Sequence, residues 1–198
     1  IAETSDAPAT SFGTSDSARY RIEEPSLSLS GTSATFVYPD GEHFPIALKI
    51  LGEHQLMNCA AALAVADALD LPRKTSIEAI ERMELAERWR MQLSKRADGV
   101  YVINDAYNAS PDSMKAALQT LAQLGRQGHR TVAVLGEMAE LGEFSATEHD
   151  SIGRLVVRLN IDQLFVVGVG AKLSHMGASQ EGSWDGESKY FDRIDEAL

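Results

Sequence analysis

Hydrophobic and polar positions in the first half of the chain follow a strand pattern and then a helix pattern. Residues 19–50 are rich in β-branched and aromatic side chains, with a turn signal at Pro39-Asp40-Gly41, and they predict β structure. Alanine-rich residues 54–69 predict a helix, and residues 76–83 predict a second helix after the Leu71-Pro72 break.

The second half alternates short apolar runs with helical periodicity. The runs are residues 100–103, 131–135 and 164–167, and the helical faces lie at Met114, Ala117, Leu118 and Leu121 and at Ile152, Leu155, Val156 and Leu159. Strands that alternate with helices predict an α/β domain with a mainly parallel sheet. Ser145 and Glu148 have the spacing of a capping box at the start of the later helix. A change in composition at residues 84–89 predicts the domain boundary.

Each apolar run is followed by polar or glycine residues: Asn104-Asp105, Gly136-Glu137 and Gly168. In open α/β sheets, ligands bind at the carboxyl ends of the strands. Such residues can also simply end a strand, and we favour that interpretation for Gly168 and Gly170. For Asp105 we expect a function, because the loop after it is unusually polar and aromatic.

Composition narrows the class of protein. The 198 residues are 44% hydrophobic and 24% charged, which is typical of a soluble globular protein with one or two cores. The net charge of -11 and the absence of a basic run argue against nucleic acid as a partner. No apolar stretch is long enough to span a bilayer, and residues 1–15 lack the zones of a signal peptide. Cys59, the single cysteine, fits a buried thiol in a cytoplasmic protein, which we expect to be monomeric.

Two segments before the parallel sheet could bind a nucleotide. His54 and Asn58 are four residues apart and share a face at the start of a helix, where free N–H groups favour an electron-rich ligand. An asparagine can pair with a purine edge, although a capping residue beside a surface amide explains the same spacing. Arg88 and Arg90, at the predicted boundary, could reach a phosphate when two domains close, or could be solvated linker residues.

Two loops of the sheet carry further candidates. Asp105 could accept both hydroxyls of a ribose, and Ser110 is the natural N-cap of a helix that Pro111 begins. A simple loop explains Ser110 and Pro111 but not the residues before them. The acidic side chains of segment 136–142 could bind an ammonium group or orient a second substrate, or could be solvated. His149 is expected to be a surface or packing histidine.

Taken in order, these segments resemble the Mur ligases. The features shared are Gly52-x-His54-x-x-x-Asn58, the arginine before the sheet and the loop Asn104-Asp105-Ala106-Tyr107-Asn108-Ala109-Ser110-Pro111. Residues 105–111 and 134–142 look most like the family members that join D-alanyl-D-alanine to UDP-N-acetylmuramoyl-tripeptide. The resemblance covers residues 12–198. It implies that residues 1–86 are the end of a central ATP-binding domain and residues 88–198 an incomplete C-terminal Rossmann-like domain.

The resemblance also implies roles for particular residues, with ATP and Mg²⁺ as cofactors and an acyl phosphate as intermediate. It places Asn58 at adenine with His54 and Gln55 nearby, Arg90 or less favourably Arg88 at the phosphates, Asp105 at the ribose, and Tyr107 and Asn108 beside the nucleotide. Arg90 is then the candidate catalytic residue, and no metal ligand is expected in this chain.

The chain departs from the family pattern in two ways. Ser110 stands where the family usually has asparagine, and a Gly-x-x-Gly-Lys-Thr phosphate loop does not occur. We therefore expect a fragment that is inactive alone, with the metal ligands in an upstream part. Alternatives are a folate polyglutamate-adding enzyme, a non-catalytic nucleotide-binding module, and a dinucleotide oxidoreductase. The last needs Gly-x-Gly-x-x-Gly where Asp105-Ala106-Tyr107 stands.

Overall fold

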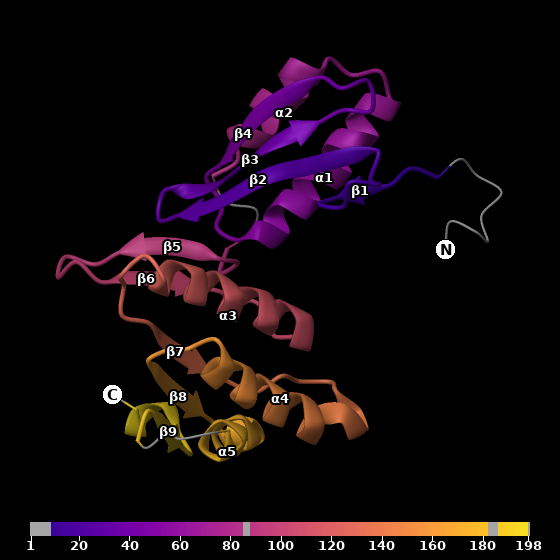
Figure 1. Ribbon diagram of the computed structural model, residues 1–198. Coiled ribbons are helices and arrows are strands. Elements are labelled where there is room, and N and C mark those ends of the chain that lie inside the picture. Colours follow the sequence, from indigo (N-terminus) through magenta and orange to yellow (C-terminus); the bar gives the residue numbers. More distant parts are fainter. Residues whose placement is uncertain (1–8, 85–87, 182–185, 198) are drawn as a thin grey trace. The chain divides into compact units, whose positions relative to one another are not determined.

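The computed structural model describes residues 9–84, 88–181 and 186–197. The chain divides into two compact units, with the division between Val102 and Ile103, and each unit is described by itself (Figure 1). The domain boundary predicted between residues 86 and 88 falls on residues 85–87, which lie outside the described residues.

The first unit contains a four-stranded sheet with two helices against it (Figure 1). Its elements are β1 (Phe12–Gly13), β2 (Tyr20–Ser28), β3 (Gly31–Val37), β4 (His43–Leu48), α1 (Glu53–Ala68) and α2 (Arg73–Glu81). β1 pairs with β2 in parallel, and β2–β3–β4 are antiparallel. The predicted β structure and long helix are confirmed. Helix α2 begins three residues before the predicted start, and the hydroxyl of Ser76, within the helix, donates to the carbonyl of Pro72, the N-cap residue (3.1 Å).

The core of this unit is an aromatic cluster beneath α1, in which Phe36 and Tyr38 meet edge to face with ring centroids 5.0 Å apart. The Arg73 guanidinium lies 4.0 Å above the Tyr38 ring. It also forms ion pairs with three carboxylates, those of Asp40, Glu42 and Asp67. The hydrogen bond from Arg73 lowers the pKa of the Asp67 carboxyl. Arg73 therefore joins α2 to α1 and to the β3–β4 turn.

Strands β5 (Gln92–Lys95) and β6 (Tyr101–Asn104) form a two-stranded sheet. The prediction that residues 100–103 form a strand is confirmed, but the prediction that this strand belongs to the parallel sheet is wrong, because β6 pairs with β5. The chain folds back between these strands because Gly99 adopts φ 89° and the Arg96 N–H donates to the Val100 carbonyl (2.8 Å). An apolar run indicates a strand but does not identify its partner.

The second unit is an α/β domain around a parallel sheet, as predicted. Its elements are α3 (Pro111–Gly125), β7 (Val132–Leu135), α4 (Ser145–Arg158), β8 (Gln163–Val167), α5 (Lys172–Gln180) and β9 (Ser188–Phe191), with 3₁₀ turns η2 (Gly142–Phe144), η3 (Val169–Ala171) and η4 (Ile194–Glu196). The strand order is β7-β8-β9. Strand β9 was not predicted, because its sequence Ser-Lys-Tyr-Phe has no apolar run.

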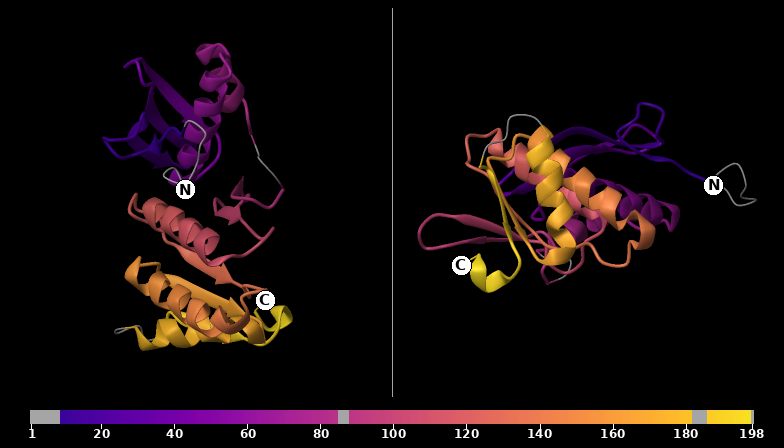
Figure 2. Two further views of the ribbon diagram at one scale, coloured as in Figure 1. Left: turned by 90° about the vertical axis from the view of Figure 1, so that its right-hand side faces the viewer. Right: turned by 90° about the horizontal axis from the view of Figure 1, so that it is seen from below.

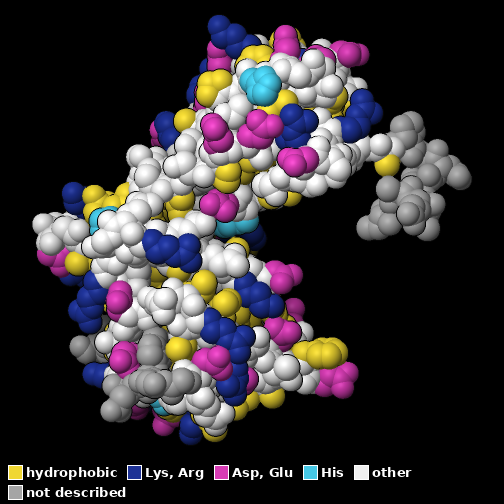
Figure 3. All heavy atoms as spheres, in the orientation of Figure 1, with side chains coloured by type: hydrophobic (Ala, Val, Ile, Leu, Met, Phe, Trp, Pro, Cys, Tyr) yellow, Lys and Arg dark blue, Asp and Glu magenta, His cyan; other side chains and the backbone are white. Residues whose placement is uncertain are grey.

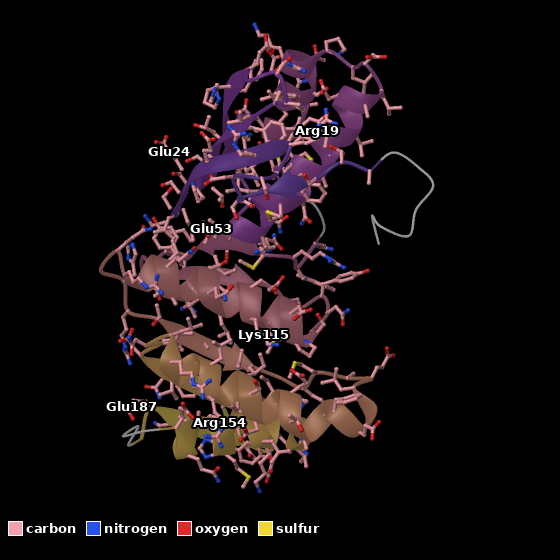
Figure 4. The ribbon with its side chains drawn as sticks, turned by 45° about the vertical axis from the view of Figure 1, so that its right-hand side comes forward. Arg19, Glu24, Glu53, Lys115, Arg154 and Glu187 are labelled. Atoms are coloured by element: carbon pink, nitrogen blue, oxygen red, sulfur yellow. The ribbon has the colours of Figure 1, made fainter. Side chains whose placement is uncertain are left out.

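Three helices and the sheet share the second core. Ala133 and Leu135 of β7 point into it, whereas Val132 and Val134 are exposed. Helices α4 and α5 lie side by side (Figure 2). Arg154 of α4 ties them together through Glu181, with Nη1 2.9 Å from Oε2. Lys115 of α3 faces α4 (Figure 4), where its Nζ is 3.8 Å from Glu148 Oε2.

The surface carries mixed charge. On the face that Figure 3 shows, basic and acidic side chains are interspersed on each unit. No helix in the described ranges combines the length and the apolar character needed to cross a lipid bilayer. A binding site for an anionic ligand on this surface would therefore depend on individual side chains and backbone N–H groups.

Candidate functional site

The start of α1 is fixed by a buried threonine of the sheet. Gly52, the N-cap, has φ 111° and donates its N–H to Thr32 Oγ1 (2.9 Å). The same hydroxyl donates to the Ile50 carbonyl (2.9 Å), and Thr32 is 1% exposed. Thr32 lies twenty residues before Gly52, so no local pattern in the sequence could have identified this support.

The structure brings the three candidates on α1 together. Gln55 Nε2 lies 3.0 Å from His54 Nε2, and Asn58 Nδ2 donates to Gln55 Oε1 (3.2 Å). Because an amide nitrogen only donates, the His54 Nε2 accepts this bond. His54 and Gln55 are half-buried and Asn58 is exposed. They form one polar surface in the first turns of the helix, with amide groups of the kind that can pair with a purine.

The two candidate arginines flank a strained backbone. Trp89 has φ 63° and Met91 has φ 47°, values that side-chain-bearing residues rarely adopt. Met91 is buried, whereas Arg88 and Arg90 are exposed, and the Arg88 guanidinium lies 5.9 Å from the centre of the Trp89 ring. This backbone presents Arg90 at the surface. Strain of this kind persists only where the surroundings enforce it.

The loop after β6 is ordered by side-chain bonds to its own backbone. Asn104 Oδ1 accepts the Ala106 N–H (3.1 Å), and Asn108 Oδ1 accepts the Ala109 N–H (2.9 Å). These bonds are the means by which asparagine stabilises turns. Asp105 is half-buried and Tyr107 is 52% exposed. The loop thus presents a carboxylate and an aromatic ring at the carboxyl end of a strand.

Helix α3 begins as predicted. Ser110 is the N-cap, its Oγ accepts the Ser113 N–H (3.3 Å), and Pro111 occupies the first turn. Ser113 returns the bond by accepting the Ser110 N–H (2.9 Å), which completes a capping box. The serine at position 110 therefore performs the capping role that the sequence assigned to it.

The acidic segment after β7 lies against the loop after β8. Met138 of this segment is 1% exposed and part of the core, whereas Glu137 and Glu140 are exposed. A Cβ atom on Gly170 would overlap the Glu137 carboxylate, so the two loops are in contact at the carboxyl ends of β7 and β8. The sequence alone favours no role for Gly170 beyond ending a strand. Only the folded structure shows that it makes room for a carboxylate.

His149 is not a surface residue. It is 0% exposed, and its Nε2 accepts the Met138 N–H (3.0 Å). The predicted capping box at Ser145 and Glu148 is wrong. Ser145 lies within the helix at φ −52° and ψ −47°, because the 3₁₀ turn η2 begins the helical path three residues earlier. In the described part of the chain, no three His, Cys, Asp or Glu side chains gather as a metal site would require.

Two family models match this chain. Residues 89–198 match the Mur ligase, glutamate ligase domain, and residues 1–66 match the Mur ligase middle domain. A UDP-N-acetylmuramoyl-tripeptide--D-alanyl-D-alanine ligase from Mycobacterium tuberculosis is 48% identical over 144 residues, which are 70% of this chain and 28% of the relative. The enzyme of the same name from Bacillus subtilis is 33% identical over 185 residues, which are 93% of this chain and 39% of the relative.

The fold is also found among solved structures. A crystal structure of MurF from Acinetobacter baumannii is similar with a TM-score of 0.82 and 30% identity, over 95% of this chain and 38% of that chain. The chain thus spans between 28% and 39% of the length of these relatives.

Proposed function

The chain belongs to the Mur ligase family, and we propose that it is part of an ATP-dependent ligase that joins D-alanyl-D-alanine to UDP-N-acetylmuramoyl-tripeptide. The observation that carries this proposal is the 48% identity to a relative of that name. Because the chain spans no more than 39% of the length of these relatives, the activity is proposed for the complete protein. The buried single cysteine, Cys59, is compatible with the reducing cytoplasm that we propose as its location.

We propose that residues 1–86 are the end of a central ATP-binding domain and residues 88–198 part of the C-terminal ligase domain. The two family matches, at 1–66 and 89–198, support this assignment. The structural division, between Val102 and Ile103, lies later in the chain and falls within β6.

For the adenine of ATP we propose Asn58, with His54 and Gln55 beside it. The hydrogen bonds that join these three side chains support the assignment, because they hold amide groups at the start of a helix. The partial positive charge at the N-terminal end of a helix also favours an electron-rich ligand. The geometry is compatible with a bound purine.

For the rest of the nucleotide we propose contacts from four further residues. Asp105 would accept the ribose hydroxyls, with Tyr107 and Asn108 lining the nucleotide, and Arg90, in preference to Arg88, would neutralise phosphate charge. The ordered loop after β6 and the surface position of Arg90 support these roles. Arg90 is the catalytic candidate, because charge neutralisation and positioning dominate phosphoryl transfer.

The proposed reaction has two steps. The tripeptide carboxylate attacks the terminal phosphorus of ATP, which gives an acyl phosphate and ADP. The amine of D-alanyl-D-alanine then attacks the acyl carbon, the amide bond forms, and phosphate leaves as the amine loses a proton. We propose that Mg²⁺ takes part, but the described residues include no cluster suited to hold it, so no step is assigned to a metal here.

The proposal is tested with the complete protein. Phosphate release should require ATP, UDP-N-acetylmuramoyl-tripeptide and D-alanyl-D-alanine together, and the product should gain the mass of the dipeptide less one water. Glutamate and a folate, supplied in place of D-alanyl-D-alanine and the tripeptide, should give no product. Activity only with glutamate and folate would instead assign the chain to the folate polyglutamate-adding enzymes.

We further expect that Arg90→Ala in the complete protein raises the KM for ATP and slows turnover, because a phosphate charge is left without its partner. Kinetics equal to the wild type would remove Arg90 from the site. Arg82→Ala, an exposed arginine at the end of α2, is the matched control and should leave both parameters unchanged.

A further inference from the structure

Both ring nitrogens of His149 are engaged in the interior of the second unit. Nδ1 lies 2.8 Å from the Ser145 carbonyl oxygen, and Nε2 lies 3.0 Å from the backbone nitrogen of Met138. A carbonyl oxygen only accepts, so Nδ1 carries the proton, and Nε2 is then free to accept the Met138 N–H. His149 is therefore a neutral imidazole with one defined tautomer.

The Met138 N–H belongs to segment 136–142, which joins β7 to the 3₁₀ turn η2 before α4. Met138 is 1% exposed, so its N–H is shielded from water and depends on the bond to His149. A buried donor that loses its partner is costly. Glu140 in the same segment has φ 62°, which a non-glycine residue adopts only when the surroundings hold it there. The backbone of the segment is thus held by its surroundings, and His149 supplies a buried hydrogen bond to that support.

The residue before Met138 is the one that this conformation places at the sheet edge. Glu137 lies two residues after the end of β7, and its carboxylate occupies the space that a Cβ atom of Gly170 would take after β8. The exposed carboxylate of Glu137 therefore lies at the carboxyl ends of two neighbouring parallel strands, β7 and β8. This edge is where ligands bind in open α/β sheets, and a carboxylate there suits an ammonium group.

We propose that His149 is a positioning residue. Its hydrogen bond to the Met138 N–H holds segment 136–142 so that the Glu137 carboxylate remains in contact with Gly170, where it binds the amine of the acceptor dipeptide. This inference rests on the proposed ligase function for the identity of the acceptor. The bond between His149 and Met138 and its effect on the segment can be tested without any activity.

The first experiment uses this chain and two matched variants. In His149→Gln the amide oxygen can reach the position of Nε2 and accept the Met138 N–H, whereas in His149→Asn the shorter side chain can replace only Nδ1. Amide hydrogen exchange at Met138 should be at least about tenfold faster in His149→Asn than in wild type, because the lost partner favours local opening. His149→Gln should stay within about threefold of wild type.

A control within the same experiment separates a local effect from unfolding. The amide of Val156, which is 0% exposed in α4, should keep its exchange rate in both variants. Equal acceleration at Met138 in the Gln and Asn variants, or no acceleration in either, would overturn the proposal. The wild-type chain offers a further check, since nitrogen NMR shifts should show Nε2 of His149 unprotonated. A proton on that atom would contradict the assignment.

The second experiment measures the complete ligase. His149→Asn should raise the KM for D-alanyl-D-alanine by about tenfold and leave the KM for ATP within about twofold, and His149→Gln should restore the acceptor KM. Faster exchange at Met138 with an unchanged acceptor KM would overturn the positioning role. If wild type shows no ligase activity with this dipeptide, the proposed function fails, and the exchange result still decides whether His149 holds the segment.

Discussion

The thiol of Cys59 lies in the core of the first unit, and burial raises its pKa to about 11. The thiolate is the reactive form, and at about pH 8 such a thiol is ionised at roughly one part in a thousand. We expect a disulfide reagent such as DTNB to modify the folded chain at least about 100-fold more slowly than the chain in denaturing urea. Rapid modification of the folded chain would show that Cys59 is accessible.

The carboxylate of Asp105 provides a test of the ribose assignment. In the complete protein, Asp105→Ala should weaken the binding of ATP by about tenfold, because a hydrogen bond to a charged group contributes a free energy of that order. Binding of an ATP analogue that lacks both ribose hydroxyls should not change. Asp112→Ala, at a fully solvated carboxylate on α3, is the matched control. Equal losses for both nucleotides would show that Asp105 acts elsewhere.

At the scale of single residues, the sequence predicts what depends on neighbours in the chain. The cap at Ser110 followed from Pro111 beside it and is confirmed. The bond of Thr32 to Gly52 and the contact of Glu137 with Gly170 join residues twenty or more positions apart. Such contacts depend on how strands are placed in the sheet, and no local spacing encodes them.

Helices α4 and α5 touch through their backbones. A Cβ atom on Gly153 would overlap the Ser174 carbonyl oxygen and lie 2.9 Å from the Ala178 nitrogen. Alanine at an exposed helix position gains up to about 1 kcal/mol over glycine, but overpacking a rigid contact costs about 1–3 kcal/mol or more. We therefore expect Gly153→Ala to destabilise the chain, against its helix propensity, as urea unfolding followed by circular dichroism would measure.

A substitution on the outer side of the same helix serves as the control for Gly153. Ser151 is exposed, so Ser151→Ala should change the free energy of unfolding by less than about 0.5 kcal/mol. If Gly153→Ala has the same free energy of unfolding as Ser151→Ala, α4 and α5 can move apart by the width of a methyl group without loss of stability. The close approach of α4 and α5 would then not contribute to the fold.

At the scale of elements, periodicity predicted the existence of most helices and strands but not all of their partners. Apolar faces identified α3 and α4, the alanine-rich run identified α1, and the apolar runs identified β7 and β8. The run at β6 was assigned to the parallel sheet, because a continuous apolar run carries no information about its neighbour. Strand β9 completes that sheet through backbone pairing with β8, with Tyr190 opposite Val166. Main-chain hydrogen bonds need no particular side chains, so its sequence gave no signal.

At the scale of the whole chain, the described residues form two separate hydrophobic cores. One contains residues of β2, β3, β4, α1 and α2, and the other contains residues of α3, α4, α5 and the parallel sheet. No residue of the described ranges belongs to both clusters. A core of its own is what allows a unit to fold independently.

This separation predicts how the chain responds to damage in one core. Leu63 and Ile152 are both 0% exposed, one in each cluster. Truncation of such a side chain to alanine costs about 2–5 kcal/mol. If the units unfold independently, Leu63→Ala should speed amide hydrogen exchange throughout the first unit and leave the second unchanged, and Ile152→Ala should do the reverse. Hydrogen exchange followed by mass spectrometry on peptides from each unit measures both. A loss of protection that spreads over the whole chain in either variant would show that the two cores unfold as one cooperative unit.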